Sequence, residues 1–211
     1  MNYKIIIALS VYITSLLASN TLGLKIMPFL FGSHLSVAVF FFPVVFLTTD
    51  VVGEVYGKIM AKAFVRAGFI STALFLVYSL LSLWMPWSED GLWARESYNT
   101  IFGVSGRIAL ASLVAFAVAE FQDVFTFFFV RERLGVRWFW LRSFLSNLWS
   151  QLLDSTLFMV VAFAGIYSTK TLLSIILTWW LYKVAMGFLY TPLSYLGIKF
   201  LKEGKDEIHQ N

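Results

Sequence analysis

Five carboxylate side chains lie inside long apolar stretches of this sequence: Asp50, Glu54, Glu120, Asp123 and Asp154. Asp50 and Glu54 are four residues apart, and Glu120 and Asp123 are three apart, so each pair shares one face of a helix. A carboxylate in hydrocarbon is costly and is usually kept for a function. The pattern therefore predicts a polar site inside a membrane.

Amide and amine side chains add to this set. Asn147 and Gln151 precede Asp154 at the spacing i, i+4, i+7, which forms one polar stripe along a helix. Asn20 lies in the first apolar stretch, and Lys183 lies near the middle of the last one. We predict that the binding residues for a substrate are Asn20, Asp50, Glu54, Glu120, Asp123, Asn147, Gln151, Asp154 and Lys183.

Depth in the membrane supports a shared site. Asp50 and Asp123 are each about seven residues from the ends of their stretches that we expect in the cytoplasm, and Gln151 is about nine. At roughly 1.5 Å per residue these groups share a layer near the midplane. Charges that only snorkel would gather at the ends of the stretches instead.

Three of these residues keep a second interpretation. Glu54 is three residues from the end of its stretch and could cap the following loop, because an end charge avoids most of the membrane cost. Lys183 could be a structural counter-ion for one carboxylate. Asn20 could be a hydrogen-bonding residue that only packs helices together.

Enzyme and metal chemistry find little support in the residue inventory. The chain has no cysteine, and its only histidines, His34 and His209, fall outside the apolar stretches. A serine–histidine pair and a histidine-based metal site are therefore missing. An aspartyl protease would need a G-x-G-D element, which does not accompany any of the buried aspartates. We predict no catalytic residue, no metal and no cofactor.

The composition indicates an integral membrane protein with a single domain, residues 1–211. Hydrophobic residues make up 59% of the 211 and charged residues 13%, with a mean hydropathy of +0.78; ordinary soluble domains have about 25% charged residues. The 22 Phe, nine Tyr and eight Trp suit lipid contact and interfacial belts. The net charge of +4 comes from basic residues in short loops, so membrane topology explains it better than nucleic-acid binding.

Six apolar stretches approach the roughly 20 residues that a helix needs to cross a bilayer. The predicted fold is thus an all-α membrane protein, a bundle of six transmembrane helices. The spans are approximately Lys4–Ile26, Ser36–Gly57, Ala61–Met85, Arg107–Val130, Arg142–Tyr167 and Thr171–Gly197. The first is interpreted as a retained span rather than a cleaved signal peptide, and the tail after Lys199 is expected to be frayed.

The orientation follows from the lysines and arginines on each side of these spans. One side, with both termini, holds 11 of them, and the opposite loops hold four. The bias predicts that both termini are cytoplasmic. The longest loop, Pro86–Gly106, would then lie outside, as an aromatic interfacial cap or as a lid over the site.

Three segments resemble the bacterial queuosine precursor transporter family, also called the vitamin uptake transporter family. They read F-F-P-V-V-F-L-T-T-D-V-V-G-E-V-Y-G-K from Phe41, S-L-V-A-F-A-V-A-E-F-Q-D-V-F-T-F from Ser112, and R-W-F-W-L-R-S-F-L-S-N-L-W-S-Q-L-L-D-S-T-L-F from Arg137. The resemblance covers most of residues 20–165. Glu120 departs from the family pattern, which often has Gln there.

The resemblance implies uptake of 7-deazaguanine precursors of queuosine, such as the 7-cyano or 7-aminomethyl compound, across the bacterial cytoplasmic (inner) membrane. It implies a six-helix architecture similar in outline to the substrate-binding components of energy-coupling-factor transporters. The matched positions are Asp50, Glu54, Asp123, Asn147, Gln151 and Asp154. The partners would be this small molecule and the lipid bilayer, with no nucleic acid.

One alternative stays open at this point. The chain could be a substrate-capture subunit for a vitamin-like compound that needs energising partner proteins. The phosphate-binding motif G-x-x-x-x-G-K-[ST] is absent from the sequence, which fits both a self-sufficient transporter and a capture subunit.

Overall fold

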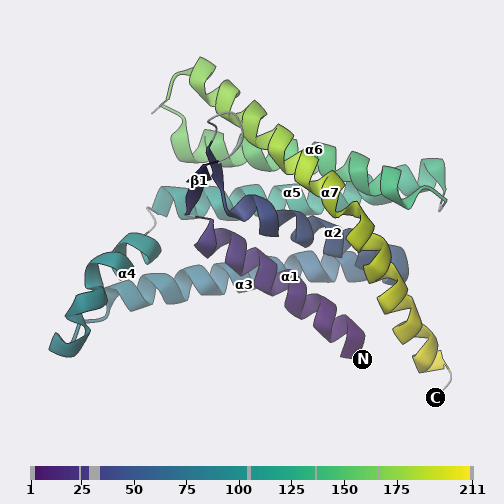
Figure 1. Ribbon diagram of the computed structural model, residues 1–211, viewed down its shortest axis with the longest axis horizontal. Helices are drawn as coiled ribbons and strands as arrows, with labels where there is room; N and C mark the ends of the chain where they lie inside the picture. The colour runs from purple at the N-terminus through teal and green to yellow at the C-terminus, as the bar shows by residue number, and fades with distance from the viewer. Residues whose placement is uncertain are drawn as a thin grey trace.

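The computed structural model describes residues 3–23, 25–28, 34–103, 106–135, 137–165 and 167–209. Within these residues, six helices of 19 residues or more run along the length of the molecule (Figure 1). They are α1 (Tyr3–Leu22), α2 (Ala38–Tyr56), α3 (Lys58–Trp84), α5 (Gly106–Leu134), α6 (Phe139–Phe163) and α7 (Thr169–His209). Both chain ends lie at the same end of the bundle, at the right in Figure 1.

The link between α1 and α2 differs from the predicted spans. α1 ends at Leu22 rather than Ile26, and Ile26–Pro28 forms a short strand, β1, paired antiparallel with β2 (His34–Ser36). The backbone N–H of Val37 donates to the Lys25 carbonyl at 3.0 Å. Pro28 has no N–H to offer to a helix, so this segment turns back as a hairpin.

Two glycines make the sharp connections at the end that holds the termini. Gly57 is the only residue between α2 and α3 and has a φ of +87°, which L side chains rarely adopt. Gly135 ends α5 with a φ of +69°, and its N–H donates to the Arg131 carbonyl at 2.9 Å. The corners therefore bring the ends of α2, α3, α5 and α6 together.

The bundle exposes many large apolar side chains, and its interior combines an apolar core with a polar face. Large apolar residues such as Leu74, Val77, Leu181 and Leu189 are exposed along α3 and α7. The buried face of α6, by contrast, is mostly polar: Arg142, Ser143, Ser146, Asn147, Ser150, Gln151, Asp154 and Ser155. A soluble protein rarely combines so many exposed large apolar residues with buried charged ones, so the surface suits contact with lipid.

Four helices are long and apolar enough to cross a membrane: α1, α3, Ala111–Leu134 of α5 and Thr169–Glu203 of α7. This count refers to the residues that the structure describes. α2 and α6, which carry Asp50 and the polar stripe, are not among the four. An all-α membrane protein is thus confirmed, while six spans remain a prediction.

Two further regions complete the fold. The loop after α3 contains a 3-10 helix, η2 (Glu89–Ala94), and α4 (Arg95–Phe102). The Tyr98 hydroxyl donates to Ser82 Oγ at 2.8 Å, which ties α4 to the end of α3. α7 continues through Pro192 to His209, well beyond the predicted span that ends at Gly197; fraying of the tail after Lys199 stays a prediction.

Candidate functional site: a buried polar cluster between α2, α5 and α6

The predicted polar stripe of α6 is buried and faces its neighbours. Asn147, Gln151 and Asp154 are buried; Ser143 extends the same face toward the start of the helix, and Ser150 lies on it between Asn147 and Asp154. Their spacing of three or four residues repeats the helical turn, which is why one face of α6 can be polar while Trp149 is exposed.

Asp50 of α2 lies against the first turns of this stripe. Its carboxylate accepts hydrogen bonds from the Ser143 hydroxyl and from Asn147 Nδ2, the latter at 3.3 Å, and only 1% of the residue is exposed. Asn147 is oriented by a second bond to the Ser143 carbonyl, at 2.9 Å. Asp50 is therefore held by α6 and not by the helix that carries it.

Asp123 and Glu120 bring a second helix, α5, to the same place. Ser150 Oγ donates to Asp123 Oδ1 at 2.9 Å, one turn along α6 from Asn147. Glu120 Oε2 accepts from the hydroxyl of Tyr12, on α1, at 3.2 Å. The three carboxyl groups of Asp50, Glu120 and Asp123 are close enough to influence one another electrostatically. We call Asp50, Glu120, Asp123, Ser143, Asn147, Ser150 and Gln151 the polar cluster.

Three acceptor oxygens of the polar cluster make no hydrogen bond within the described part of the chain. They are Glu120 Oε1, Asp123 Oδ2 and Gln151 Oε1, and all three are buried. Buried polar atoms are nearly always partnered, because an unmade bond costs about 1–3 kcal/mol. These three oxygens of the cluster are therefore acceptors that remain available to a hydrogen-bond donor.

Asp154 and Lys183 form an ion pair beside the cluster. The Lys183 ammonium group on α7 contacts Asp154 Oδ2, and it also lies 5.1 Å from the centre of the Phe42 ring. Both side chains are largely buried. The counter-ion interpretation of Lys183 thus has a geometric basis, while ligand contact by either residue stays a prediction.

Asn20 lies elsewhere, between α1 and α5. Its Oδ1 accepts a hydrogen bond from Ser112 Oγ at 3.2 Å. This is the contact expected of an amide that packs two helices together, and a role of Asn20 in binding stays a prediction.

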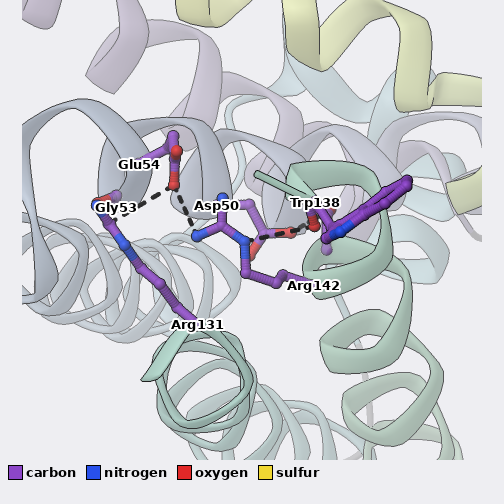
Figure 2. A network of polar contacts seen from close by, with 7 residues as sticks. Asp50, Gly53, Glu54, Arg131, Trp138 and Arg142 are labelled. Atoms are coloured by element: carbon purple, nitrogen blue, oxygen red, sulfur yellow. Dashed lines mark hydrogen bonds and ion pairs between the residues drawn. The ribbon is translucent and has the colours of Figure 1, made fainter. Parts of the chain in front are cut away.

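Glu54 is engaged by two arginines at the end of α2 (Figure 2). Its Oε2 lies 3.0 Å from Arg142 NH1 and 3.6 Å from Arg131 NH1. Arg131 also donates to the Gly53 carbonyl at 3.3 Å. The carboxylate thus forms ion pairs that join α2 to α5 and α6 at the bundle end, and contact of Glu54 with a substrate stays a prediction.

Several residues that contact the predicted ones were not themselves predicted. Ser143 and Ser150 could have been found, because they continue the stripe of Asn147 and Gln151 by the same spacing. Arg142 was counted only as a basic residue for topology, although it is fully buried. Tyr12 gave no signal, since an aromatic residue in an apolar stretch does not reveal which way it points.

The types of side chain in the polar cluster limit its chemistry. Carboxylates, amides and hydroxyls suit hydrogen bonding to a donor-rich molecule. Groups of three or more His, Cys, Asp or Glu that could hold a metal ion do not occur among the described residues. A helical bundle with a lipid-facing surface and buried carboxyl groups defines a multi-pass membrane protein that handles a polar small molecule.

Comparison with known proteins identifies the family. Residues 36–197 match the family model described as "Putative vitamin uptake transporter". The chain belongs to this vitamin uptake transporter family, and it is a transporter rather than an enzyme. The match includes α2, α5 and α6, which carry the polar cluster.

Two relatives cover most of the chain. The "Probable queuosine precursor transporter" of Bacillus subtilis (strain 168) is 34% identical over 175 residues, which are 82% of this chain and 75% of the relative. The "Queuosine precursor transporter" of Escherichia coli (strain K12) is 30% identical over 161 residues, 76% of this chain and 70% of the relative. No solved structure matches the chain.

Proposed function

We propose that this protein imports queuosine precursors of the 7-deazaguanine class across the bacterial inner membrane, with both termini in the cytoplasm. All six long helices would span the bilayer, including α2 and α6. The names of the two relatives support the substrate. The observation that carries the site is the group of buried acceptors without a partner among the described residues, Glu120 Oε1, Asp123 Oδ2 and Gln151 Oε1.

The chemistry of a deazaguanine fits these acceptors. Its pyrimidine ring carries an exocyclic amine and a neighbouring ring N–H along one edge, and carboxylates accept such parallel donors well. An aminomethyl substituent would add a cation, which a carboxylate also favours. Asp50 would complete the site from α2, because it faces the same stripe of α6.

Uptake by the purified protein tests this function. Proteoliposomes should accumulate or exchange 7-cyano-7-deazaguanine or 7-aminomethyl-7-deazaguanine, and should discriminate against guanine. Empty liposomes and the Asp123→Asn variant are the controls, and the variant should lose most of the activity. If neither binding nor uptake of any deazaguanine is found, the proposal is wrong. If binding occurs but uptake requires a co-purifying ATPase, the chain is a capture subunit.

Variants of Asp154 and Lys183 distinguish contact with the substrate from charge balance between the two residues. Asp154→Asn keeps the shape of the side chain but leaves the Lys183 ammonium group without its carboxylate, so uptake should fall at least about tenfold. In the double variant Asp154→Asn/Lys183→Met both charges are gone. If Asp154 contacts the substrate, uptake stays low in the double variant. Full recovery would show that the two residues only balance each other.

A further inference from the structure

Three helix ends meet at the end of the bundle that holds the termini. Glu54 lies in the last turn of α2, Arg131 in the last turn of α5 and Arg142 in the first turn of α6. Figure 2 shows the two guanidinium groups converging on the Glu54 carboxylate from different helices. One carboxylate thus connects α2, α5 and α6, the helices that carry the polar cluster.

Arg142 is the most constrained member of this network. Its side chain is 0% exposed, and its guanidinium lies 3.0 Å from Glu54 Oε2. Nε donates to the Trp138 carbonyl at 3.4 Å, and the group lies 5.1 Å from the centre of the Phe127 ring. Arg131 NH1 lies farther from Glu54 Oε2, at 3.6 Å, and the Arg131 side chain is more exposed than that of Arg142. The most buried ionic link between α2 and α6 is therefore the Arg142–Glu54 pair.

This link lies one helical turn from the polar cluster. Glu54 follows Asp50 by four residues on α2, and Arg142 directly precedes Ser143 on α6. Two parallel connections thus join α2 and α6: the Ser143 hydroxyl donates to Asp50, and Arg142 pairs with the Glu54 carboxylate. The ionic connection is the one nearer the bundle end, so it closes that end above Asp50.

We propose that Arg142 is a positioning residue: through Glu54 it holds α2 against α6 and closes the polar cluster toward the end with the termini. The link must break for a molecule to pass on this side, because α2 and α6 have to separate there. A buried ion pair suits such a device, since both charges can be hydrated once the helices part. The proposal rests on the proposed transport function, which gives a closure its purpose.

Thiol accessibility tests the closure without any substrate. The chain has no cysteine, so Ser146→Cys provides a single buried probe on the face of α6 next to Ser143. Lys202→Cys, at an exposed position of α7, provides a probe outside the closure. Membrane vesicles of both orientations are treated with an impermeant methanethiosulfonate reagent. Labelling of Lys202→Cys shows in which vesicles the bundle end that holds the termini faces the reagent.

The expected result is faster labelling of the buried probe when the link is weakened. In Glu54→Gln, the Ser146→Cys probe should react roughly tenfold faster or more from the terminal end, as expected for a shift of that size in the open population. Glu54→Asp keeps a carboxylate beside Arg142, but its side chain is one methylene shorter. The labelling rate of the Ser146→Cys probe should therefore lie between that in the parent and that in Glu54→Gln. Lys202→Cys should react at the same rate in all backgrounds.

A matched ion pair at the same end serves as control. Lys4 of α1 and Glu203 of α7 lie 4.0 Å apart, and Glu203→Gln should leave the rate at Ser146→Cys unchanged. If Glu54→Gln and Glu54→Asp both label as slowly as the parent, the link does not close the cluster and the proposal is wrong. Should faster labelling occur in a protein that transports no deazaguanine, the closure stands and the proposed substrate falls.

Discussion

At the scale of single residues, two carboxylates of the polar cluster, Glu120 and Asp123, are each hydrogen-bonded through one oxygen only among the described residues. Tyr12 donates to one oxygen of Glu120, and Ser150 donates to one oxygen of Asp123. The second oxygen of each carboxylate is buried without a hydrogen bond in the described chain. The protein therefore orients each acid with one oxygen and presents the other, which is how a binding site is preorganised.

Removing the Tyr12 hydroxyl should weaken substrate binding. Tyr12→Phe keeps the ring but takes away the donor to Glu120 Oε2, and a hydrogen bond to a charged group contributes about 1.5–3 kcal/mol. Glu120 would then turn freely or bind its own surroundings, so we expect at least about tenfold weaker binding of a deazaguanine by the purified protein. Isothermal titration of the detergent-solubilised protein measures this.

The same chemical change elsewhere provides the control. Tyr98→Phe also removes one hydroxyl that donates to a side chain, Ser82, but it lies in α4 at the opposite end of the bundle. The Tyr98→Phe variant should bind a deazaguanine with the same affinity as the parent. Equal affinities for Tyr12→Phe and the parent would mean that Glu120 does not depend on Tyr12, and that Oε1 is not presented as we infer.

At the scale of elements, the position of α1 depends on a close approach to α3. An added Cβ at Gly68 would lie 2.8 Å from the Tyr12 ring and hydroxyl. Tyr12 is fully buried and packs on Phe64 with ring centres 5.7 Å apart, so it cannot swing aside. The glycine is therefore what allows α1 to bring Tyr12 to Glu120.

Gly68→Ala should consequently disturb both stability and binding. The new methyl group forces the Tyr12 ring away, at a cost of about 1–3 kcal/mol for overpacking, and stretches the bond to Glu120. A thermal unfolding assay should show a lower Tm and a titration should show weaker binding. Gly187→Ala is the control, because nothing lies within 4 Å of its added Cβ. Its free energy of unfolding should rise by about 0.5–1 kcal/mol. A Tm for Gly68→Ala at or above that of the parent would contradict this.

The sequence predicted the elements better than the contacts between them. Hydrophobic stretches located the six long helices, and helical spacing placed Asn147, Gln151 and Asp154 on one face. Helix rotation was not predictable where all residues are apolar, which is why Tyr12 was missed. Arg142 was missed because a basic residue at the edge of a stretch normally snorkels to water, whereas here a carboxylate and two aromatic rings hold it inside. The hairpin of β1 and β2 has too few residues to show a period.

At the scale of the whole molecule, polarity is arranged in two directions. Across the bundle, apolar side chains face outward and the carboxyl groups face inward. Along the bundle, basic residues concentrate at one end, where the termini and the corners at Gly57 and Gly135 lie. The first arrangement suits a lipid environment, and the second predicts which end lies in the cytoplasm. The orientation can therefore be tested independently of transport.

Two single-cysteine variants define the orientation. Trp93, in η2, is 87% exposed, and Lys202 is exposed near the end of α7; Figure 1 places the two regions at opposite ends of the molecule. With six spans and cytoplasmic termini, an impermeant maleimide applied to intact cells should label Trp93→Cys and not Lys202→Cys, and both should react after permeabilisation. The cysteine-free parent supplies the blank. Labelling of Lys202→Cys alone would invert the topology, because the basic end would then lie outside. Labelling of both in intact cells would show that the two positions share one side, so that α5, α6 and α7 could not all be membrane spans.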